Sequence, residues 1–355
     1  MNLSDGVKVI AFDWGGTLMT GSGPQDRPMV EWPEVEAVSG AVEVLQILRS
    51  RFRLVVCTNA EISTAEQVRA ALDRVGLAGY VEAVFTPKEL GNARKPQVDF
   101  FRRVEDALGV SRHEALMVGD DPLGDIGGAV VAGWRAVWFN PSGKPAPALL
   151  PLGDAEIMRL EELPAVLQCH RLPAVDQARL WLLEQRATAN LLVHVEMVAA
   201  LAYQMAVWLR NSGQPVNPLL AQRGGLLHDL CKISARGTKI LHGDLAAEWL
   251  HAHGETELAG IAATHMLFNL IEDGKRPATW EEKIVYYADK LVENGQVVPF
   301  SRRMDALRQR YAMDQALIDR LAEAIPPLES ELTAPLGWTI EDLVERLQQS
   351  FWKGY

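Results

Sequence analysis

The chain has little cysteine, and the cysteines it has follow no spacing. Cys57, Cys169 and Cys231 are the only three among 355 residues, and no Cys-x-x-Cys pair occurs. This pattern excludes a disulfide framework and a zinc ribbon as the basis of the fold.

Long apolar runs and a surplus of positive charge are also missing. No stretch approaches 18 unbroken apolar residues, and no basic-then-apolar leader precedes residue 7. The formal net charge is −11 and the pI is about 5.3, whereas a broad nucleic-acid groove needs a basic face. We therefore expect a cytoplasmic protein with no membrane partner and no extended nucleic-acid interface. Nucleic-acid ends or a small phosphorylated ligand stay compatible, because a metal ion can supply positive charge.

The composition does provide enough apolar material for more than one core. Hydrophobic residues make up 48% of the chain and charged residues 23%, which is ordinary for a globular protein, and the length predicts about two domains. The pattern changes near residues 171–173, beyond a proline-rich stretch at 140–147. We predict one domain over residues 1–170 and a second over residues 173–355.

Residues 1–170 alternate short apolar runs with amphipathic segments. The predicted strands are 7–12, 54–57, 83–86, 115–119 and 135–139, and helical spacing occurs near 40–50, 61–75, 97–108 and 125–132. Apolar strands separated by helices predict an α/β fold with a doubly wound parallel sheet covered on both faces. Ligands bind such sheets at the carboxyl ends of the strands, which is where Asp13, Thr58 and Asp120 fall.

Four motifs occur at these strand ends in a fixed order. They are Asp13-Trp14-Gly15-Gly16-Thr17-Leu18, Thr58-Asn59, Lys95 before Pro96, and the segment 119–125 with Asp120 and Asp125. Together they resemble the haloacid dehalogenase (HAD) superfamily, over roughly residues 5–165. The resemblance implies a Rossmann-like domain in which Asp13 attacks phosphorus and forms an aspartyl-phosphate.

The same resemblance implies roles for the other motif residues. Thr58 and Lys95 would act as catalytic groups on the phosphoryl oxygens, with Asn59 as a further substrate contact. The implied cofactor is Mg²⁺, because an anionic nucleophile approaches an anionic phosphate only if cations and donors neutralise the charge. Its implied ligands are Asp13, the Gly15 carbonyl, Asp120 and Asp125.

Gly15 departs from the family pattern. Phosphatases of the family carry there a second Asp, which acts as general acid and base and contributes about 10²–10⁴-fold to the rate. We therefore expect a poor alkyl-phosphatase. Only 38 residues separate Leu18 from Cys57 and 24 separate Lys95 from Asp120, so we expect a capless domain.

The second half carries imidazoles and carboxylates on apolar helical faces. His194 shares a face with Leu191 and Val198, and Asp289 shares one with Val285 and Val292. One buried histidine is more often a hydrogen-bonded core residue than a ligand. Six such groups are costly to bury unless they are paired or coordinated, so the pattern favours a metal cluster of His194, His228, Asp229, His242, His265 and Asp289.

The sequence segments that contain these six residues resemble the HD superfamily of metal-dependent phosphohydrolases, over about residues 185–312. The pattern is nearest to the bacterial HD-type symmetrical dinucleoside-tetraphosphate hydrolases, with HD phosphodiesterases almost as near. The resemblance implies an all-α domain with two divalent transition metals, Fe, Mn, Ni or Co. His194, His228, Asp229 and Asp289 would bind the first metal, and Asp229 would bridge to a second held by His242 and His265.

Two further assignments concern cationic residues of this half. Lys232 lies one helical turn after His228 and is either a catalytic phosphate contact or a solvated helix residue. The segment 301–311 is interpreted as a supporting helix, with Arg302 and Arg303 as candidates for substrate contact.

The sequence as a whole predicts a two-domain phosphohydrolase for a small phosphorylated substrate, a nucleotide-type phosphoester or phosphoanhydride. The dinuclear HD site is expected to be the main centre, and the HAD site to act on monoesters. Two alternatives stay open: a HAD phosphatase with the helical domain as its cap, and a nucleotide-sensing or scaffold protein with a weakened HAD site. The sequence does not specify the substrate, the HD metals or the oligomeric state.

Overall fold

The computed structural model describes residues 1–302, 304 and 315–352, which divide into two compact units. The first unit contains Met1–Lys144 and Pro151–Arg171, and the second contains Pro145–Leu150 and the chain from Leu172 onward. The short strap Pro145–Leu150 therefore belongs to the second unit although its flanks belong to the first. Arg303 and most of the helix predicted over 301–311 lie outside the described residues.

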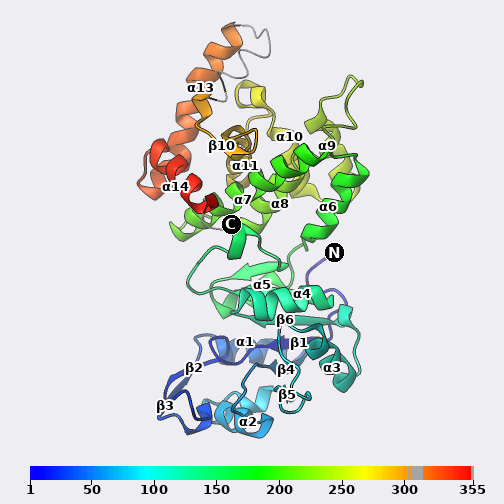
Figure 1. Ribbon diagram of the computed structural model, residues 1–355, viewed down its shortest axis with the longest axis vertical. Coiled ribbons are helices and arrows are strands. Elements are labelled where there is room, and N and C mark those ends of the chain that lie inside the picture. The colour runs from blue at the N-terminus through cyan, green and yellow to red at the C-terminus, as the bar shows by residue number, and fades with distance from the viewer. Residues whose placement is uncertain (303, 305–314, 353–355) are drawn as a thin grey trace. The chain divides into compact units, whose positions relative to one another are not determined.

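A six-stranded sheet forms the centre of the first unit, and all of its strands are parallel (Figure 1). The strand order is β5-β4-β1-β6-β7-β8. Phe12, the last residue of β1, pairs with Val56 of β4 and Val118 of β6. This register brings the residues after these three strands to one edge. The strands are β1 (Val9–Phe12), β4 (Arg53–Cys57), β5 (Ala83–Phe85), β6 (Ala115–Gly119), β7 (Arg135–Phe139) and β8 (Ala155–Ile157).

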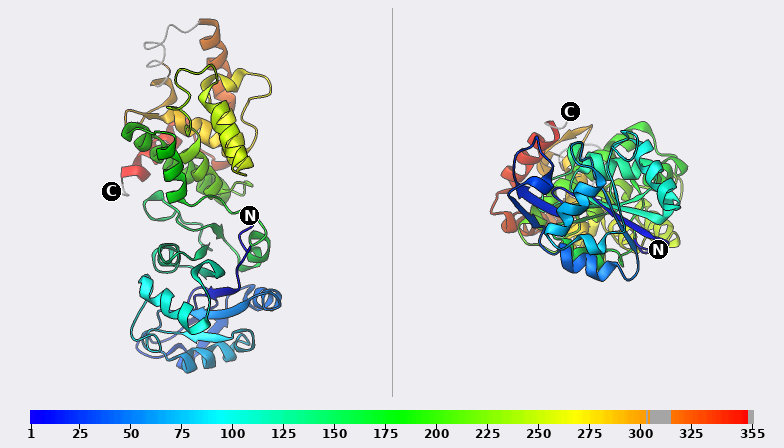
Figure 2. Two further views of the ribbon diagram at one scale, coloured as in Figure 1. Left: turned by 90° about the vertical axis from the view of Figure 1, so that its right-hand side faces the viewer. Right: turned by 90° about the horizontal axis from the view of Figure 1, so that it is seen from below.

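Helices cover both faces of this sheet, as predicted (Figure 2). Residues of α1, α2 and α5 share one apolar cluster with inward side chains of β1, β4 and β6. α3 packs beside α4, and the crossovers that contain them return in the opposite direction, which places them on the other face. The helices are α1 (Ala41–Leu48), α2 (Ala65–Arg74), α3 (Val98–Leu108), α4 (Gly128–Ala132) and α5 (Leu163–Val166), with short turns η2 (Ala78–Tyr80), η3 (Arg112–Glu114), η4 (Pro122–Gly127) and η6 (Leu160–Glu162).

The interval between β1 and α1 is structured, although the sequence analysis predicts no element there. β2 (Met19–Ser22) and β3 (Glu34–Ala37) form an antiparallel hairpin, and η1 (Met29–Glu31) lies in the loop between them. We call residues 23–33 the flap loop. The interval holds this hairpin rather than a cap domain, in agreement with the expected capless architecture.

The second unit is helical and is organised around α7 (Ala189–Asn211), which packs against α8, α11 and α14. Polar side chains fix the helix starts: Thr188 accepts a hydrogen bond from the Leu191 amide, and Asn217 accepts one from the Leu219 amide. The helices are α6 (Val175–Glu184), α7, α8 (Pro218–Leu227), α9 (His242–Ala252), α10 (Thr256–Thr264), α11 (Trp280–Leu291), α13 (Gln315–Thr333) and α14 (Ile340–Trp352), with turns η5 (Pro147–Leu149), η7 (Leu267–Ile271) and η8 (Ala334–Leu336).

α7 is long and apolar enough, by length and composition, to cross a membrane. Two-thirds of its most apolar window, 67%, is buried inside the protein. Buried core helices have the same length and composition, so this property alone is weak evidence for a membrane span.

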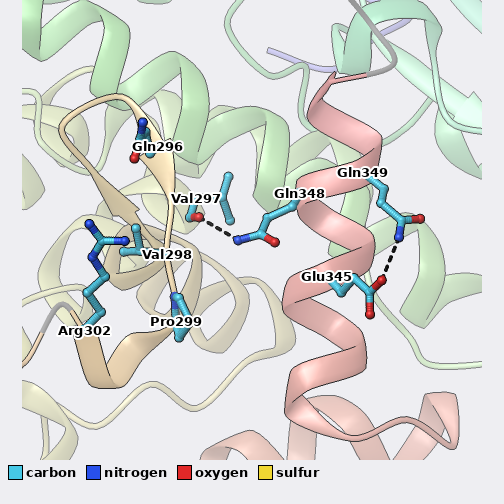
Figure 3. Close-up of a pocket in the computed structure, with 8 residues that line it drawn as sticks. All are labelled: Gln296, Val297, Val298, Pro299, Arg302, Glu345, Gln348 and Gln349. Atoms are coloured by element: carbon cyan, nitrogen blue, oxygen red, sulfur yellow. Dashed lines mark hydrogen bonds between the residues drawn. The ribbon is translucent and has the colours of Figure 1, made fainter.

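One short hairpin interrupts the helices of the second unit. β9 (Val292–Glu293) and β10 (Gln296–Val297) are antiparallel. α14 lies beside β10, where the Gln348 side-chain amide donates to the Val297 carbonyl at 2.9 Å, and the groove between them has a volume of about 700 Å³ (Figure 3). None of the described residues that line this groove belongs to a group of possible metal ligands.

Candidate functional site

The first group of predicted site residues meets at the carboxyl edge of the parallel sheet. Lys95 lies at its centre, 4% exposed. Its ammonium donates to Asp13 Oδ1 at 2.7 Å, to the Cys57 carbonyl at 2.7 Å and to Asp125 Oδ1. Three segments distant in the sequence are thereby joined through one buried cation.

Burial and charge act in opposite directions on these groups. Burial raises the pKa of Asp125 to about 7 although Lys95 attracts its charged form, and burial raises the pKa of Asp13 in the same way. Burial disfavours the charge of Lys95, but the two carboxylates outweigh it and raise the lysine pKa above its ordinary value. Lys95 is therefore a fixed positive charge beside the predicted nucleophile.

Asp120 completes a set of three carboxylates. One oxygen from each of Asp13, Asp120 and Asp125 lies within 4.8 Å of the others. Thr17 donates to Asp120 Oδ1 at 2.9 Å. Gly16 has a φ of +86°, and a Cβ there would come within 2.6 Å of Asp120 Oδ2, so only glycine allows this approach. A cluster of oxygen ligands of this kind suits a hard divalent cation such as Mg²⁺.

The remaining predicted residues of this half line the same cavity, which measures about 390 Å³. Thr58 is buried. The Asn59 side chain donates to the Lys95 carbonyl and accepts from the Lys95 amide, both at 2.9 Å, so it positions Lys95 as well as facing the cavity. A Cβ at Gly15 would meet only Met29 Cε, at 3.9 Å. Packing therefore leaves room for a side chain where the second Asp is missing.

The flap loop forms the outer wall of this cavity through Gln25, Arg27, Met29 and Trp32. The sequence analysis assigns no role to these residues. No motif marks them, because they come together only through the hairpin formed by β2 and β3.

The second group of predicted residues comes from five helices or helix ends of the second unit. His194 is on α7, His228 and Asp229 follow α8, His242 begins α9, His265 follows α10, and Asp289 is on α11. The close approach of α7 and α8 depends on Gly225, where a Cβ would lie 2.7 Å from the Ala199 Cα. The ends of α8, α9 and α10 thus place their histidine and aspartate side chains in one buried cluster.

Asp229 lies in the middle of this cluster, 1% exposed. Its Oδ2 is 3.6 Å from His194 Nε2 and 3.4 Å from His228 Nε2. Its Oδ1 is 3.0 Å from His242 Nε2 and 3.4 Å from His265 Nε2. The two carboxylate oxygens therefore face two different pairs of imidazoles.

Asp289 lies beside His194 and His228, the pair that faces Asp229 Oδ2. Its Oδ1 is 3.0 Å from His194 Nε2 and 3.6 Å from His228 Nε2. His194, His228 and Asp289 form one compact group of possible ligands, and His228, Asp229 and His265 form another. All six predicted ligands are brought together.

The ring orientations fit ligands of a cation. His228 Nδ1 lies 2.7 Å from the Gly225 carbonyl, and His265 Nδ1 lies 2.7 Å from the Ala262 carbonyl, which directs both Nε2 atoms into the cluster. His194 Nε2, His228 Nε2 and Asp229 Oδ1 are buried, and none of their close contacts with other described side chains has the geometry of a hydrogen bond. Buried polar atoms are rarely left in this way, and a metal ion would satisfy all three.

Burial and the neighbouring carboxylates shift the pKa values of the histidines in this cluster in different directions. Burial opposes the charge of His228, but Asp229 and Asp289 overcome it and raise the His228 pKa to about 9. Burial lowers the pKa of His265 to about 4. The carboxylates thus require positive charge, which one imidazolium or a metal ion can provide.

Two lysines contact the cluster. Lys232 Nζ lies 2.5 Å from Asp229 Oδ2 with a partly exposed side chain. Lys290 is buried, donates to Asp289 Oδ2 at 2.7 Å and to the His265 carbonyl, and lies over the Tyr286 ring. Lys290 is not among the residues predicted from the sequence, although its place directly after an inward-facing Asp on an apolar helix is a signal.

The chain is similar in sequence to several known proteins. The chain is 29% identical over 151 residues to the uncharacterized protein MJ0778 of Methanocaldococcus jannaschii, covering 39% of this chain and 88% of that protein. It is 35% identical over 101 residues to the pyrimidine 5'-nucleotidase YjjG of Escherichia coli and 34% identical over 135 residues to a phosphoserine phosphatase of Thermus thermophilus. These matches cover 28% and 37% of this chain, and 44% and 51% of the two enzymes, so the chain spans about half the length of each.

A solved structure of an uncharacterized Listeria monocytogenes protein aligns with a TM-score of 0.41 at 26% identity, covering 45% of this chain and 97% of that one. Two family models match separate parts of the chain. The haloacid dehalogenase-like hydrolase model matches residues 28–133, which begins after Asp13, and the HD domain model matches residues 191–294, which includes all six predicted ligands. These matches show a haloacid dehalogenase-like hydrolase domain followed by an HD domain.

Proposed function

We propose that the protein is a cytoplasmic two-site phosphohydrolase whose main centre is a dinuclear metal site in the HD domain. The observation that carries this proposal is the position of Asp229. Each of its two oxygens faces a separate pair of imidazoles, and this is the arrangement expected of a carboxylate that bridges two cations.

His194, His228, Asp229 and Asp289 would hold the first metal, and Asp229, His242 and His265 the second. Both families depend on metals, and a mixed imidazole and carboxylate set suits Fe, Mn, Ni or Co. Two divalent ions would supply positive charge for the phosphate and lower the pKa of an attacking water. Lys232, at the partly exposed side of the cluster, would contact a phosphate oxygen once a metal takes its place beside Asp229.

The substrate proposed for this centre is a nucleotide-type phosphoester or phosphoanhydride, such as a dinucleoside polyphosphate. The resemblance of the ligand pattern to the HD-type dinucleoside-tetraphosphate hydrolases supports this class. The acidic net charge of −11 supports a small substrate over an extended nucleic acid.

The HAD domain would act on phosphomonoesters through Asp13. Its carboxylate attacks phosphorus, and the bond from phosphorus to the leaving oxygen breaks. Because residue 15 provides no acid, the leaving group departs as an anion and takes its proton from water. A water molecule then hydrolyses the aspartyl-phosphate, which releases inorganic phosphate and restores Asp13. Lys95 and Thr58 would hold the phosphoryl oxygens, with Mg²⁺ at Asp13, Asp120, Asp125 and the Gly15 carbonyl supplying further positive charge.

The test is a double dissociation in the full-length protein, with a panel of phosphomonoesters, diesters and dinucleoside polyphosphates. Asp13→Asn is expected to lower the Mg²⁺-dependent monoesterase by at least about a thousandfold and to leave diester or dinucleotide cleavage intact. Asp229→Ala is expected to do the reverse. Asp73→Asn, at an exposed position of α2, is the matched control for the change in charge.

Two results would contradict the proposal. If either substitution abolished both activities in a folded protein, the HD domain would be better described as a cap for the HAD site. If neither site showed turnover with any member of the panel, the chain would be a nucleotide-sensing protein, the reading that Gly15 partly favours.

A further inference from the structure

Hydrogen bonds connect the flap loop, the outer wall of the cavity at Asp13, to α2. Arg74 of α2 donates to the carbonyls of Val30 at 2.8 Å and Trp32 at 2.7 Å. The Trp32 indole donates to the Arg27 carbonyl at 3.1 Å. A Cβ on Gly23 would come within 2.3 Å of the Trp32 ring, so the start of the flap loop packs directly on this indole. The flap loop is therefore connected by hydrogen bonds both within itself and to α2.

The charges that line this cavity are unequally distributed. Five of the described lining residues are acidic: Asp13, Asp120, Asp121, Asp125 and Glu61, whose carboxylate is paired with Arg94. The buried ammonium of Lys95 is already paired with two of them. Arg27 also lines the cavity, and it forms no ion pair with any described residue.

Apolar side chains stand beside Arg27. Met29 and Trp32 line the cavity from the flap loop, and Ile62, which is 43% exposed, lines it from the loop after β4. The cavity volume of about 390 Å³ accommodates a phosphoryl group together with a small organic leaving group. With the phosphoryl group at Asp13, a leaving group would occupy the rest of the cavity, which these apolar side chains and Arg27 line.

We propose that Arg27 determines substrate specificity by binding a second anionic group, a carboxylate or phosphate, on the leaving group of the monoester. This inference rests on the proposed phosphomonoesterase of the HAD domain. A guanidinium forms charge-assisted, bidentate hydrogen bonds with such anions. Arg74 is the positioning residue, because it fixes the loop that carries Arg27 without lining the cavity itself.

The experiment compares two substrates whose leaving groups differ only in charge: 4-carboxyphenyl phosphate and its neutral carboxamide analogue. kcat and KM are measured with Mg²⁺ on the full-length protein. Arg27→Gln is expected to lower kcat/KM for the carboxylate substrate by about tenfold, mainly through KM, and to change the carboxamide by less than about twofold. Arg27→Lys is expected to recover part of the loss, because it restores the charge without the bidentate geometry.

Arg51→Gln is the matched control, since it removes the same charge from an exposed position that does not line the cavity. Arg74→Ala is expected to reduce the preference for the carboxylate substrate while retaining activity on the carboxamide. Equal losses on both substrates in Arg27→Gln would overturn the inference, because Arg27 would then act on the phosphoryl group or attract every anion. No loss on either substrate would overturn it as well. If Asp13→Asn retained the activity, the proposed monoesterase itself would fail, which is a separate result.

Discussion

Asp13 and Asp125 of the first unit share one buried lysine, whereas the two carboxylates of the second unit lie among imidazoles in addition to their lysine partners. Lys95 donates to both Asp13 and Asp125. In the second unit, Asp229 lies between two pairs of histidine nitrogens. The first arrangement suits a carboxylate that acts as the nucleophile itself. In the second arrangement, imidazole nitrogens and carboxylate oxygens face one common place. This suits metal ions that activate a water molecule as the nucleophile.

The two sites also differ in how they are supported. The first is assembled from loops at strand ends and is bordered by the exposed flap loop. The second is assembled from helices and helix ends, and His228 and His265 are oriented by backbone carbonyls three residues earlier in the chain. We therefore expect the first site to tolerate the addition of a side chain. We expect metal binding at the second site to be sensitive to substitution of residues that contact the ligands from outside the cluster.

Gly15→Asp tests the first part of this comparison and has the larger expected effect. The new carboxyl group has room, because only Met29 Cε lies near a Cβ at this position, at 3.9 Å. It would protonate the leaving oxygen, so hydrolysis of alkyl phosphates should rise by about 10²-fold, and hydrolysis of nitrophenyl phosphate, whose leaving group needs no acid, should rise much less. Steady-state kinetics on both substrates provide the measurement.

Gly15→Asn is the control, since it adds nearly the same volume without a titratable proton. An equal rise with Asn would show that the added side chain acts by packing. No rise with Asp, in a protein whose Asp13 is essential, would mean that another group already supplies the proton.

Lys290→Met tests the second part and has the smaller expected effect. The buried ammonium holds Asp289 and the His265 carbonyl in place, and residues behind metal ligands contribute about 10–100-fold to metal affinity. We expect a loss of about tenfold in affinity for Mn²⁺ in the HD domain, measured by titration calorimetry, with an unchanged HAD monoesterase. Lys283 lies on the same helix and is paired with Glu331, so Lys283→Met should have no effect on metal affinity. An equal loss of affinity in Lys283→Met would show that the effect is not specific to Lys290.

Much of both sites could be predicted from the sequence because the ligands follow strong secondary-structure patterns. Apolar runs place Asp13, Thr58 and Asp120 at one sheet edge once the strands are parallel, and helical spacing turns His194 and Asp289 inward. The residues that contact one another across the sheet are distant in sequence, so the pairing of Lys95 with Asp125 required the structure.

Three features escaped the sequence analysis for physical reasons. β2 buries only its first residue, so this strand has no alternating apolar pattern to reveal the hairpin. Lys290 is charged, and helical patterning assigns charged residues to the surface. The strap Pro145–Leu150 joins the second unit through a tertiary contact, a hydrogen bond from the Ala146 amide to the Tyr203 hydroxyl at 3.0 Å. A division of the chain at residue 172 would separate this strap from its unit.

Metal analysis of the purified protein tests the central claim most directly. Mass spectrometry should find about two transition-metal ions per chain after reconstitution with Mn²⁺ or Fe²⁺, as a dinuclear centre requires. Asp229→Ala should lose most of both ions while Asp13→Asn keeps them, because Asp229 is the proposed bridge. A folded wild-type protein that binds no transition metal after reconstitution, or an Asp229→Ala variant that retains both ions, would contradict the account.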